Sequence, residues 1–137
     1  RSKERAENAA KAIEARFGVK VRPVRGADEA ARAKDLEGAQ IVFAAGAIGI
    51  ELVKTSHWEG NPTIEAVADV NAQPPLGLEG IEATDKGKER DGKLCFGALG
   101  IGGLKLKLHR ACIGQLFENP DQVLDAEHIY ALAKEMA

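Results

Sequence analysis

Residues 41–47 read IVFAAGA, a short unbroken apolar run that passes directly into a turn of small residues. An apolar run of this length predicts a strand buried on both faces, as in the middle of a parallel sheet. Small residues after such a strand let a flat ligand approach the backbone at its carboxyl end. The stretch therefore predicts an α/β sheet with a binding edge.

Two helical patterns and one strand pattern precede this stretch. Residues 1–17 place apolar side chains at helical spacing, with Ser2 as the N-cap. Residues 28–36 predict a second, short helix that is rich in alanine and charge. Between the helices, residues 19–24 alternate valine with charged residues and predict a short strand, which Pro23 marks as an edge strand.

The pattern continues after the quoted stretch. The predicted elements are a helical turn or two at 48–54, a strand at 63–70, a loop rich in glycine and proline at 71–92, and a strand at 94–99. Residues 100–117 fit a strand over a few positions and a helix over a longer window, and we prefer the helix. Asp125 is the expected N-cap of a last helix that runs through Met136.

Strands that alternate with helices over short connections imply βαβ units. The predicted fold class is therefore α/β, an incomplete Rossmann-like three-layer domain with a mainly parallel sheet. The chain begins with Arg1 and charged helix-forming residues, which suggests a start in the middle of a domain.

Composition narrows the function classes. The chain has 137 residues, 45% of them hydrophobic and 29% charged, as in ordinary globular proteins. Its formal net charge of -2 argues against a general nucleic-acid binder, and no apolar run approaches the roughly 20 residues that span a bilayer. Cys95 and Cys112 lack metal-ligand spacing, so we expect buried thiols, no metal site and a reduced, cytoplasmic protein.

Three small-residue turns follow predicted strands, at 44–47, 71–75 and 97–100. Carboxyl ends of parallel strands share one edge of a sheet, where ligands bind in open α/β folds. Each turn by itself could be a tight strand-to-helix connection, but three together favour a ligand. The usual G-x-G-x-x-G phosphate loop is absent. The run from Gly97 to Gly103 is rich in glycine, but its spacing is wrong, because Lys105 stands where the last glycine of that motif should be.

Arg1, Ser2 and Lys3 add a charge argument at the start of the first helix. Two cations, a hydroxyl and a helix N-terminus suit the 2′-phosphate of NADP, where an acidic residue would suit the 2′-hydroxyl of NAD. The alternative is a solvated helix start with no ligand.

Four segments together are specific to one family. Residues 41–49, 68–77, 83–88 and 96–112 resemble the C-terminal part of the methylene-tetrahydromethanopterin dehydrogenases of methylotrophs, including the relative that acts on methylene-tetrahydrofolate. The resemblance covers nearly the whole chain. It implies oxidation of a methylene-tetrahydropterin to its methenyl form with NADP, and in some members also NAD, at a cleft between an N-terminal pterin domain and a Rossmann domain.

The resemblance makes residues 1–137 the C-terminal portion of an NAD(P)-binding Rossmann domain. The N-terminal pterin domain and the glycine-rich first βαβ unit are not in this sequence, so we expect no activity from the chain alone. It also matches residues 1–3 to the segment where the family holds the 2′-phosphate. The expected cofactor-binding residues are Arg1, Ser2, Lys3, Ala44, Ala45, Gly46, Asn71, Gln73 and Ala98.

No catalytic side chain can be named, because hydride transfer needs positioning more than a nucleophile or metal. The expected partner is a tetrahydropterin substrate, and association with further copies of the chain is left open. Two other functions remain as alternatives: a different NADP-dependent oxidoreductase, such as one resembling shikimate dehydrogenase or glutamyl-tRNA reductase, and a non-catalytic nucleotide-binding domain. Residues 71–77 and 96–112 argue against the first.

Overall fold

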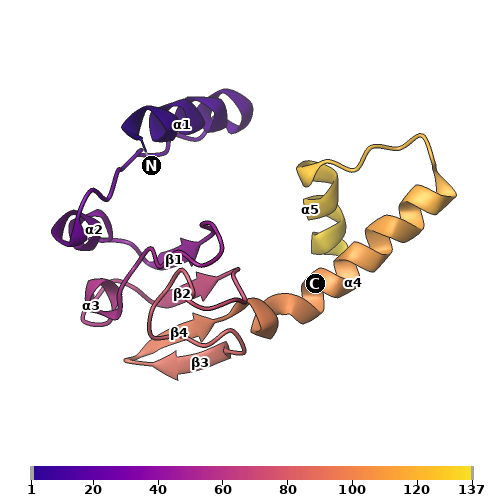
Figure 1. Cartoon of the computed structure of the whole chain (residues 1–137). Helices are drawn as coiled ribbons and strands as arrows, with labels where there is room; N and C mark the ends of the chain where they lie inside the picture. Colours follow the sequence, from indigo (N-terminus) through magenta and orange to yellow (C-terminus); the bar gives the residue numbers. More distant parts are fainter. Residues whose placement is uncertain (1, 137) are drawn as a thin grey trace.

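The computed structural model describes residues 2–136, and its centre is an open four-stranded sheet (Figure 1). The strands are β1 (Ile41–Ala44), β2 (Ala66–Asp69), β3 (Lys86–Arg90) and β4 (Lys93–Phe96), in the spatial order β1-β2-β4-β3. β1, β2 and β4 run parallel, and β3 joins β4 as an antiparallel edge. The predicted α/β class with a mainly parallel sheet is confirmed, and the sheet is that of an incomplete Rossmann-like domain.

Five helices accompany the sheet in the described residues. They are α1 (Lys3–Phe17), α2 (Glu29–Asp35), α3 (Thr55–Trp58), α4 (Ala98–Glu118) and α5 (Ala126–Glu135). Ser2, Asp28 and Asp125 cap the helices α1, α2 and α5 by accepting hydrogen bonds from backbone N–H groups of the first turn. The helices predicted at 28–36, 100–117 and 125–136 are confirmed, as is the described part of the one at 1–17.

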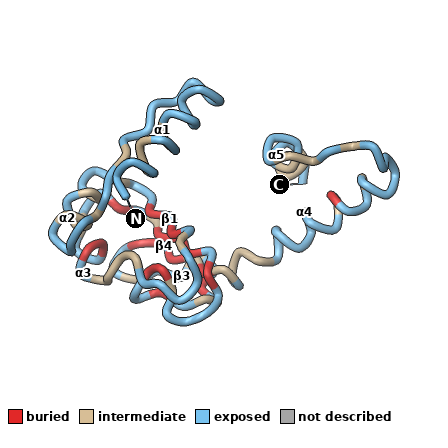
Figure 2. The backbone as a smooth tube through the Cα atoms, turned by 45° about the horizontal axis from the view of Figure 1, so that its top comes forward, coloured by how far each residue is buried: buried red, intermediate tan, exposed pale blue. Residues whose placement is uncertain are grey.

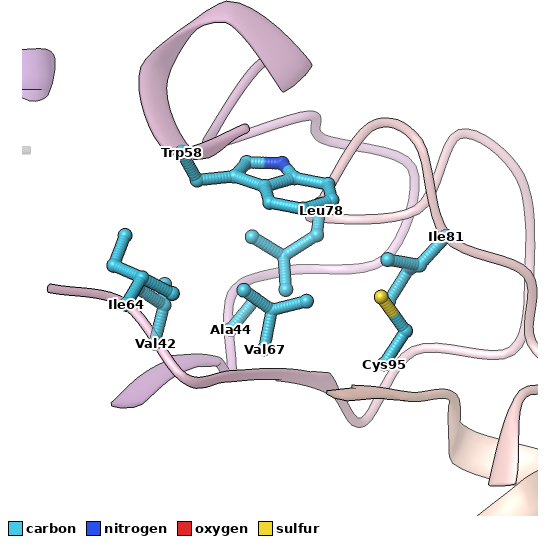
Figure 3. Packing of buried hydrophobic residues seen from close by; sticks show 8 residues of the cluster. All are labelled: Val42, Ala44, Trp58, Ile64, Val67, Leu78, Ile81 and Cys95. Atoms are coloured by element: carbon cyan, nitrogen blue, oxygen red, sulfur yellow. The ribbon is translucent and has the colours of Figure 1, made fainter. Parts of the chain in front are cut away.

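The hydrophobic core lies on one face of the sheet (Figure 3). Trp58 and Leu78 are each 1% exposed and cover Val67, which is fully buried. Burying a side chain of this size contributes about 1.5–3 kcal/mol. The remaining members of the cluster are Val42, Ala44, Ile64, Ile81 and Cys95.

The other face of the sheet carries apolar side chains that are exposed. Ile41 and Phe43 are 68% and 60% exposed, and they alternate along β1 with the buried Val42 and Ala44. The prediction that this strand is buried on both faces is therefore wrong for the described residues. The difference arises because the pleat of a strand directs successive side chains to opposite faces of the sheet, and only one of these faces is covered here.

Two predicted elements are absent. Residues 19–24 form no strand, because a strand needs a partner for its N–H and C=O groups and these residues pair with none of the described strands. Residues 48–54 form no helix. Instead, the N–H groups of Leu52 and Val53 donate to the carbonyl oxygen of Gly77 at 2.8 and 3.0 Å. The helix of this region begins later, at Thr55.

Two strand boundaries are also corrected. The predicted strand at 63–70 shortens to β2, and the one predicted at 94–99 ends at Phe96 because α4 begins at Ala98. The predicted loop at 71–92 contains β3, which pairs with β4 through a hairpin at Asp91 and Gly92. Both turn residues have positive φ, 49° and 70°, as a two-residue hairpin turn requires, and Asp-Gly is a strong sequence indicator of that turn.

α1, α4 and α5 stand apart from this core (Figure 2). None of the residues of α1 or α5 is buried, and α4 has a single buried residue, Cys112. An exposed ion pair between Arg16 and Glu127, with Nε 3.0 Å from Oε1, links α1 to α5. Within residues 2–136, no helix combines the length and the apolar character needed to cross a bilayer.

Candidate functional site

The carboxyl ends of the three parallel strands meet at one edge of the sheet (Figure 1). Ala44 is in register with Asp69, and Ala68 is in register with Phe96. The turns at 44–47, 71–75 and 97–100 follow these strand ends directly. Tertiary structure therefore places the three predicted turns beyond the same edge, which is where ligands bind in open α/β sheets.

The first two turns are joined by Asn71. Its side chain is 7% exposed, and its Nδ2 donates a hydrogen bond to the carbonyl oxygen of Gly46 at 3.3 Å. Ala44 is buried in the core, whereas Ala45 is exposed and carries only a methyl group at the edge. A Cβ on Gly46 would lie 2.4 Å from Cδ1 of Leu52, so this glycine lets the first turn pack against that side chain.

The loop after β2 is organised by a carboxylate that the sequence analysis did not single out. Asp69 is fully buried, and its two oxygens accept hydrogen bonds from the backbone N–H groups of Asn71 and Leu78, both at 2.8 Å. Gln73 lies within this loop and is exposed. An acidic residue at the last position of an otherwise apolar strand was the only sequence sign of this arrangement.

The glycines of the third turn also pack against protein atoms, but here these atoms belong to backbone carbonyl groups. A Cβ on Gly97 would lie 2.1 Å from the carbonyl oxygen of Glu82, and one on Gly100 would lie 1.8 Å from that of Asp85. The N–H groups of Leu99 and Gly100 donate to the carbonyl oxygen of Ala83. Close packing against residues 82–86 therefore explains these glycines. Ala98 lies between these glycines as the first residue of α4 and is half-buried.

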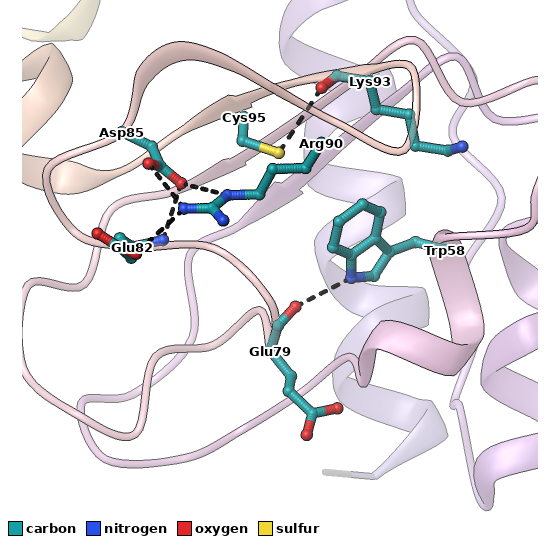
Figure 4. A network of polar contacts seen from close by, with 7 residues as sticks. All are labelled: Trp58, Glu79, Glu82, Asp85, Arg90, Lys93 and Cys95. Carbon is teal, nitrogen blue, oxygen red and sulfur yellow. Dashed lines mark hydrogen bonds and ion pairs between the residues drawn. The ribbon is translucent and has the colours of Figure 1, made fainter.

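The segment that packs against the third turn contains an ion-pair network centred on Asp85 (Figure 4). The guanidinium of Arg90 donates to both oxygens of Asp85, at 3.0 and 3.1 Å, and the N–H of Glu82 donates at 2.9 Å. Burial acts to raise the pKa of the Asp85 carboxyl, but these hydrogen bonds hold that pKa below its ordinary value. The N–H of Gly97 donates to the Asp85 carbonyl oxygen at 2.8 Å, so the network fixes the start of α4.

The predicted phosphate-binding residues lie on α1. Arg1 is outside the described residues. The Ser2 hydroxyl accepts a hydrogen bond from the N–H of Arg5 at 3.4 Å, and Lys3 forms an exposed ion pair with Glu7 at 3.6 Å. Within residues 2–136, no hydrogen bond or ion pair joins Ser2 or Lys3 to the sheet edge, whereas Asn71 and Gly46 are brought together.

The described residues offer no competing metal centre. No group of three or more His, Cys, Asp or Glu side chains between Ser2 and Met136 is placed to hold a metal ion. Cys95 and Cys112 are both buried, and burial raises the pKa of the Cys95 thiol. At the sheet edge, the described residues place backbone groups, small side chains and the Asn71 amide.

Comparison with known proteins identifies two relatives. The chain is 59% identical over all 137 residues to bifunctional protein MdtA of Methylorubrum extorquens strain AM1, of which it covers 48%. It is 30% identical, over 98% of its length, to the NAD(P)-dependent methylenetetrahydromethanopterin dehydrogenase of the same strain, of which it covers 46%. The chain spans about half the length of these curated relatives, and no family model matches it. The comparisons confirm the predicted resemblance.

Proposed function

From this similarity we propose that the chain is the nucleotide-binding part of an NAD(P)-dependent methylene-tetrahydropterin dehydrogenase. The reaction is oxidation of methylene-tetrahydromethanopterin or methylene-tetrahydrofolate to the methenyl form by hydride transfer. The observation that carries the proposal from the structure is the edge at which Asn71 bonds Gly46 beyond parallel strands. The relative with the matching enzyme name supports the reaction class.

This reaction requires the protein mainly to position the cofactor and the substrate relative to each other. When bound, NADP⁺ supplies a nicotinamide ring that accepts two electrons and a proton as one hydride, giving NADPH. The methylene carbon of the substrate gives up that hydride, and a neighbouring nitrogen lone pair stabilises the resulting cation. No protein nucleophile is required, so the residues at the edge act by holding the ring and excluding water.

The edge fits a flat ring in its donor set and its shape. Ala45 is exposed and carries only a methyl group, and Asn71 has a side-chain amide whose Nδ2 donates to the carbonyl oxygen of Gly46. We assign Ala44, Ala45, Gly46, Asn71, Gln73 and Ala98 to the nicotinamide side of the cofactor. Of these, Ala44 acts from the core side, because it is only 4% exposed.

We assign the adenosine 2′-phosphate to residues 1–3. The N-terminus of a fifteen-residue helix attracts an anion, and Ser2 and Lys3 add a hydroxyl and a cation at its first turn. The cofactor is then NADP in preference to NAD. NAD remains usable, since one cationic cluster gives a preference and not exclusion.

The same proposal includes the domain organisation. β1 is an outer strand of the described sheet, although it is apolar and parallel to its neighbour, and parallel strands of this kind are usually covered on both sides. Residues 19–24 are valine-rich and are not paired with any described strand. Both features fit a Rossmann domain whose glycine-rich first βαβ unit, together with an N-terminal pterin domain, belongs to the half of the relatives that this chain does not match. Such an enzyme would act in the cytoplasm. Whether several copies of it associate is left open by this proposal.

The test is turnover by the complete protein. With NADP⁺ and either methylene-tetrahydromethanopterin or methylene-tetrahydrofolate, we expect NADPH to form, as followed by its near-ultraviolet absorbance. Replacing Asn71 with leucine should lower the rate, because it removes the bond to Gly46 and adds bulk at the edge. Tight NADPH binding without turnover of either substrate would instead favour a non-catalytic nucleotide-binding domain.

The 2′-phosphate assignment has a matched control on the same helix. Lys3→Glu should reduce kcat/KM with NADP⁺ more than with NAD⁺, because it places a negative charge beside the phosphate. Lys11→Glu changes another exposed lysine two turns further along α1 and should leave the ratio unchanged. Equal effects of the two substitutions would contradict the assignment.

A further inference from the structure

Asp69 is the one fully buried carboxylate among the described residues, and it lies at the end of the central parallel strand β2. No cationic side chain between Ser2 and Met136 pairs with it. Its Oδ1 accepts from the N–H of Asn71 and its Oδ2 accepts from the N–H of Leu78, so one side chain holds both ends of the intervening loop. Buried polar groups are tolerated when they are hydrogen-bonded, and here each carboxylate oxygen accepts one hydrogen bond from the loop.

The loop closes tightly over this carboxylate. A Cβ on Gly77 would lie 3.1 Å from Asp69 Oδ2 and 3.2 Å from the Cβ of Ala44, so only a glycine fits there without displacement. The carbonyl oxygen of Gly77 in turn accepts from the N–H groups of Leu52 and Val53. The loop, the first turn and residues 52–53 therefore form one connected layer around Asp69.

The same contact sets the position of Asn71. Its backbone N–H is held by Asp69, and its side-chain Nδ2 is bonded to the Gly46 carbonyl. Two fixed points leave the Asn71 side chain little freedom to move away from the first turn. Loss of the backbone contact would release the loop while the sheet, whose core residues lie on its covered face, stays folded.

We propose that Asp69 is a positioning residue for hydride transfer: its buried carboxylate orders residues 71–78 and so holds Asn71 at the carboxyl edge of the sheet. The inference rests on the proposed function and deepens it, because it names a residue that acts on the ring only through Asn71. Reacting groups misplaced by about 1 Å can lose on the order of a hundredfold in rate, so the ordering of this loop matters for turnover.

The test compares Asp69→Asn with Val67→Ala in the complete protein. The carboxamide is nearly isosteric, but its NH₂ group faces one of the two backbone N–H donors and cannot accept from it. We expect kcat to fall by about 10–100-fold with the KM for NADP⁺ changed by less than about threefold, since loop misplacement affects the reacting geometry more than binding. Amide hydrogen exchange in residues 71–78 should rise while β1 and β4 stay protected.

Val67→Ala is the matched control, because Val67 is equally buried two residues earlier in β2 but packs in the core. It should lower stability and leave both kcat and loop exchange unchanged. Gly77→Ala offers a milder variant that pushes on the Asp69 carboxylate without removing it, and its kcat should lie between those of wild type and Asp69→Asn.

The outcomes separate the two proposals. An active wild type with an equally active Asp69→Asn variant, or unchanged loop exchange in that variant, would overturn the role of Asp69 alone. A rate loss in Val67→Ala as large as that in Asp69→Asn would mean that lower stability explains both losses, and it would also overturn the role of Asp69. A wild-type protein that oxidises neither methylene-tetrahydropterin would overturn the proposed function, and this inference with it.

Discussion

The sheet unit, residues 39–97, and the helices α1, α4 and α5 are held in place by different forces. The sheet unit contains every described buried residue except Cys112 (Figure 2). Its core side chains pack together over one face of the sheet (Figure 3). The three helices have caps and internal hydrogen bonds but leave large side chains exposed, among them Phe117 at 85% and Tyr130 at 65%. Packing stabilises the first region, whereas local hydrogen bonding shapes the second.

The largest expected effect comes from emptying the core of the sheet unit. Trp58→Ala removes the indole that covers Val67 and whose Nε1 donates to the Glu79 carbonyl oxygen, so it should cost about 3–5 kcal/mol in the free energy of unfolding. Phe117→Ala in α4 should cost less than about 0.5 kcal/mol, because that ring is exposed. Urea denaturation of the 137-residue chain measures both, and equal costs would show that the α4 surface is buried in solution.

The second comparison sits within α4 itself. Gly100→Ala would drive a methyl group into the Asp85 carbonyl, and we expect a cost of about 3 kcal/mol, at the upper end of overpacking effects. Gly114→Ala, where the same methyl meets nothing within 4 Å, should stabilise the helix by up to about 1 kcal/mol. Thermal unfolding of the two variants checks the difference in sign. Two changes of the same sign would mean that both ends of α4 have similar surroundings.

The third comparison uses pH. Arg90→Gln removes the guanidinium that lowers the pKa of Asp85, and loss of these charge-assisted hydrogen bonds should cost about 2 kcal/mol near neutral pH. Because the folded-state pKa is depressed, this stability is present above the unfolded pKa of about 3.9 and is lost as pH falls through the folded value. The stability gap between wild type and variant should therefore be constant near neutrality and shrink below about pH 4.

Denaturation curves at several pH values measure that gap. Lys88→Gln removes an exposed charge on the same strand that makes no hydrogen bond to Asp85, so it serves as the control and should show a much smaller gap. A gap for Arg90→Gln that stays constant down to pH 2 would contradict the assigned cause.

The smallest expected effect concerns the helices. Arg16→Gln breaks the ion pair to Glu127 that links α1 to α5, and both side chains are more than half exposed. Exposed pairs contribute about 0.2–1 kcal/mol and are screened by salt, so the change should fall at the low end and vanish at high ionic strength. A loss comparable to that of Trp58→Ala would mean that the helices share a cooperative core with the sheet unit.

The same division explains which elements could be predicted from the sequence. Ser2, Asp28 and Asp125 act on N–H groups at most three residues away, so the starts of α1, α2 and α5 could be inferred from neighbours in the chain. The strand predicted at 19–24 is wrong, because a strand needs a hydrogen-bonding partner, and the sequence of these residues alone does not show whether one is present. β3 was missed although Asp91-Gly92 is a hairpin pattern, because the surrounding glycines and prolines suggested a continuous loop.

The candidate site divides in the same way. Small residues after each strand predicted the turns at 44–47, 71–75 and 97–100, and parallel topology brought all three to one edge as expected. Spacing alone could not show that the glycines of the third turn serve backbone packing against residues 82–86, or that Asp69 ties down the loop after β2. Those contacts join residues that are far enough apart in the chain that no helical or strand periodicity in the sequence relates them.

By itself, the sequence determined the α/β class, the capped helices and the family that the chain resembles, because all three can be inferred from short-range patterns and from residue identity. Only the tertiary structure decided which face of β1 is covered, where residues 48–54 find their hydrogen bonds, and which buried carboxylate organises the edge. The reason is that strand pairing and burial depend on groups brought together from distant positions, and their free energy appears only when both partners are in place.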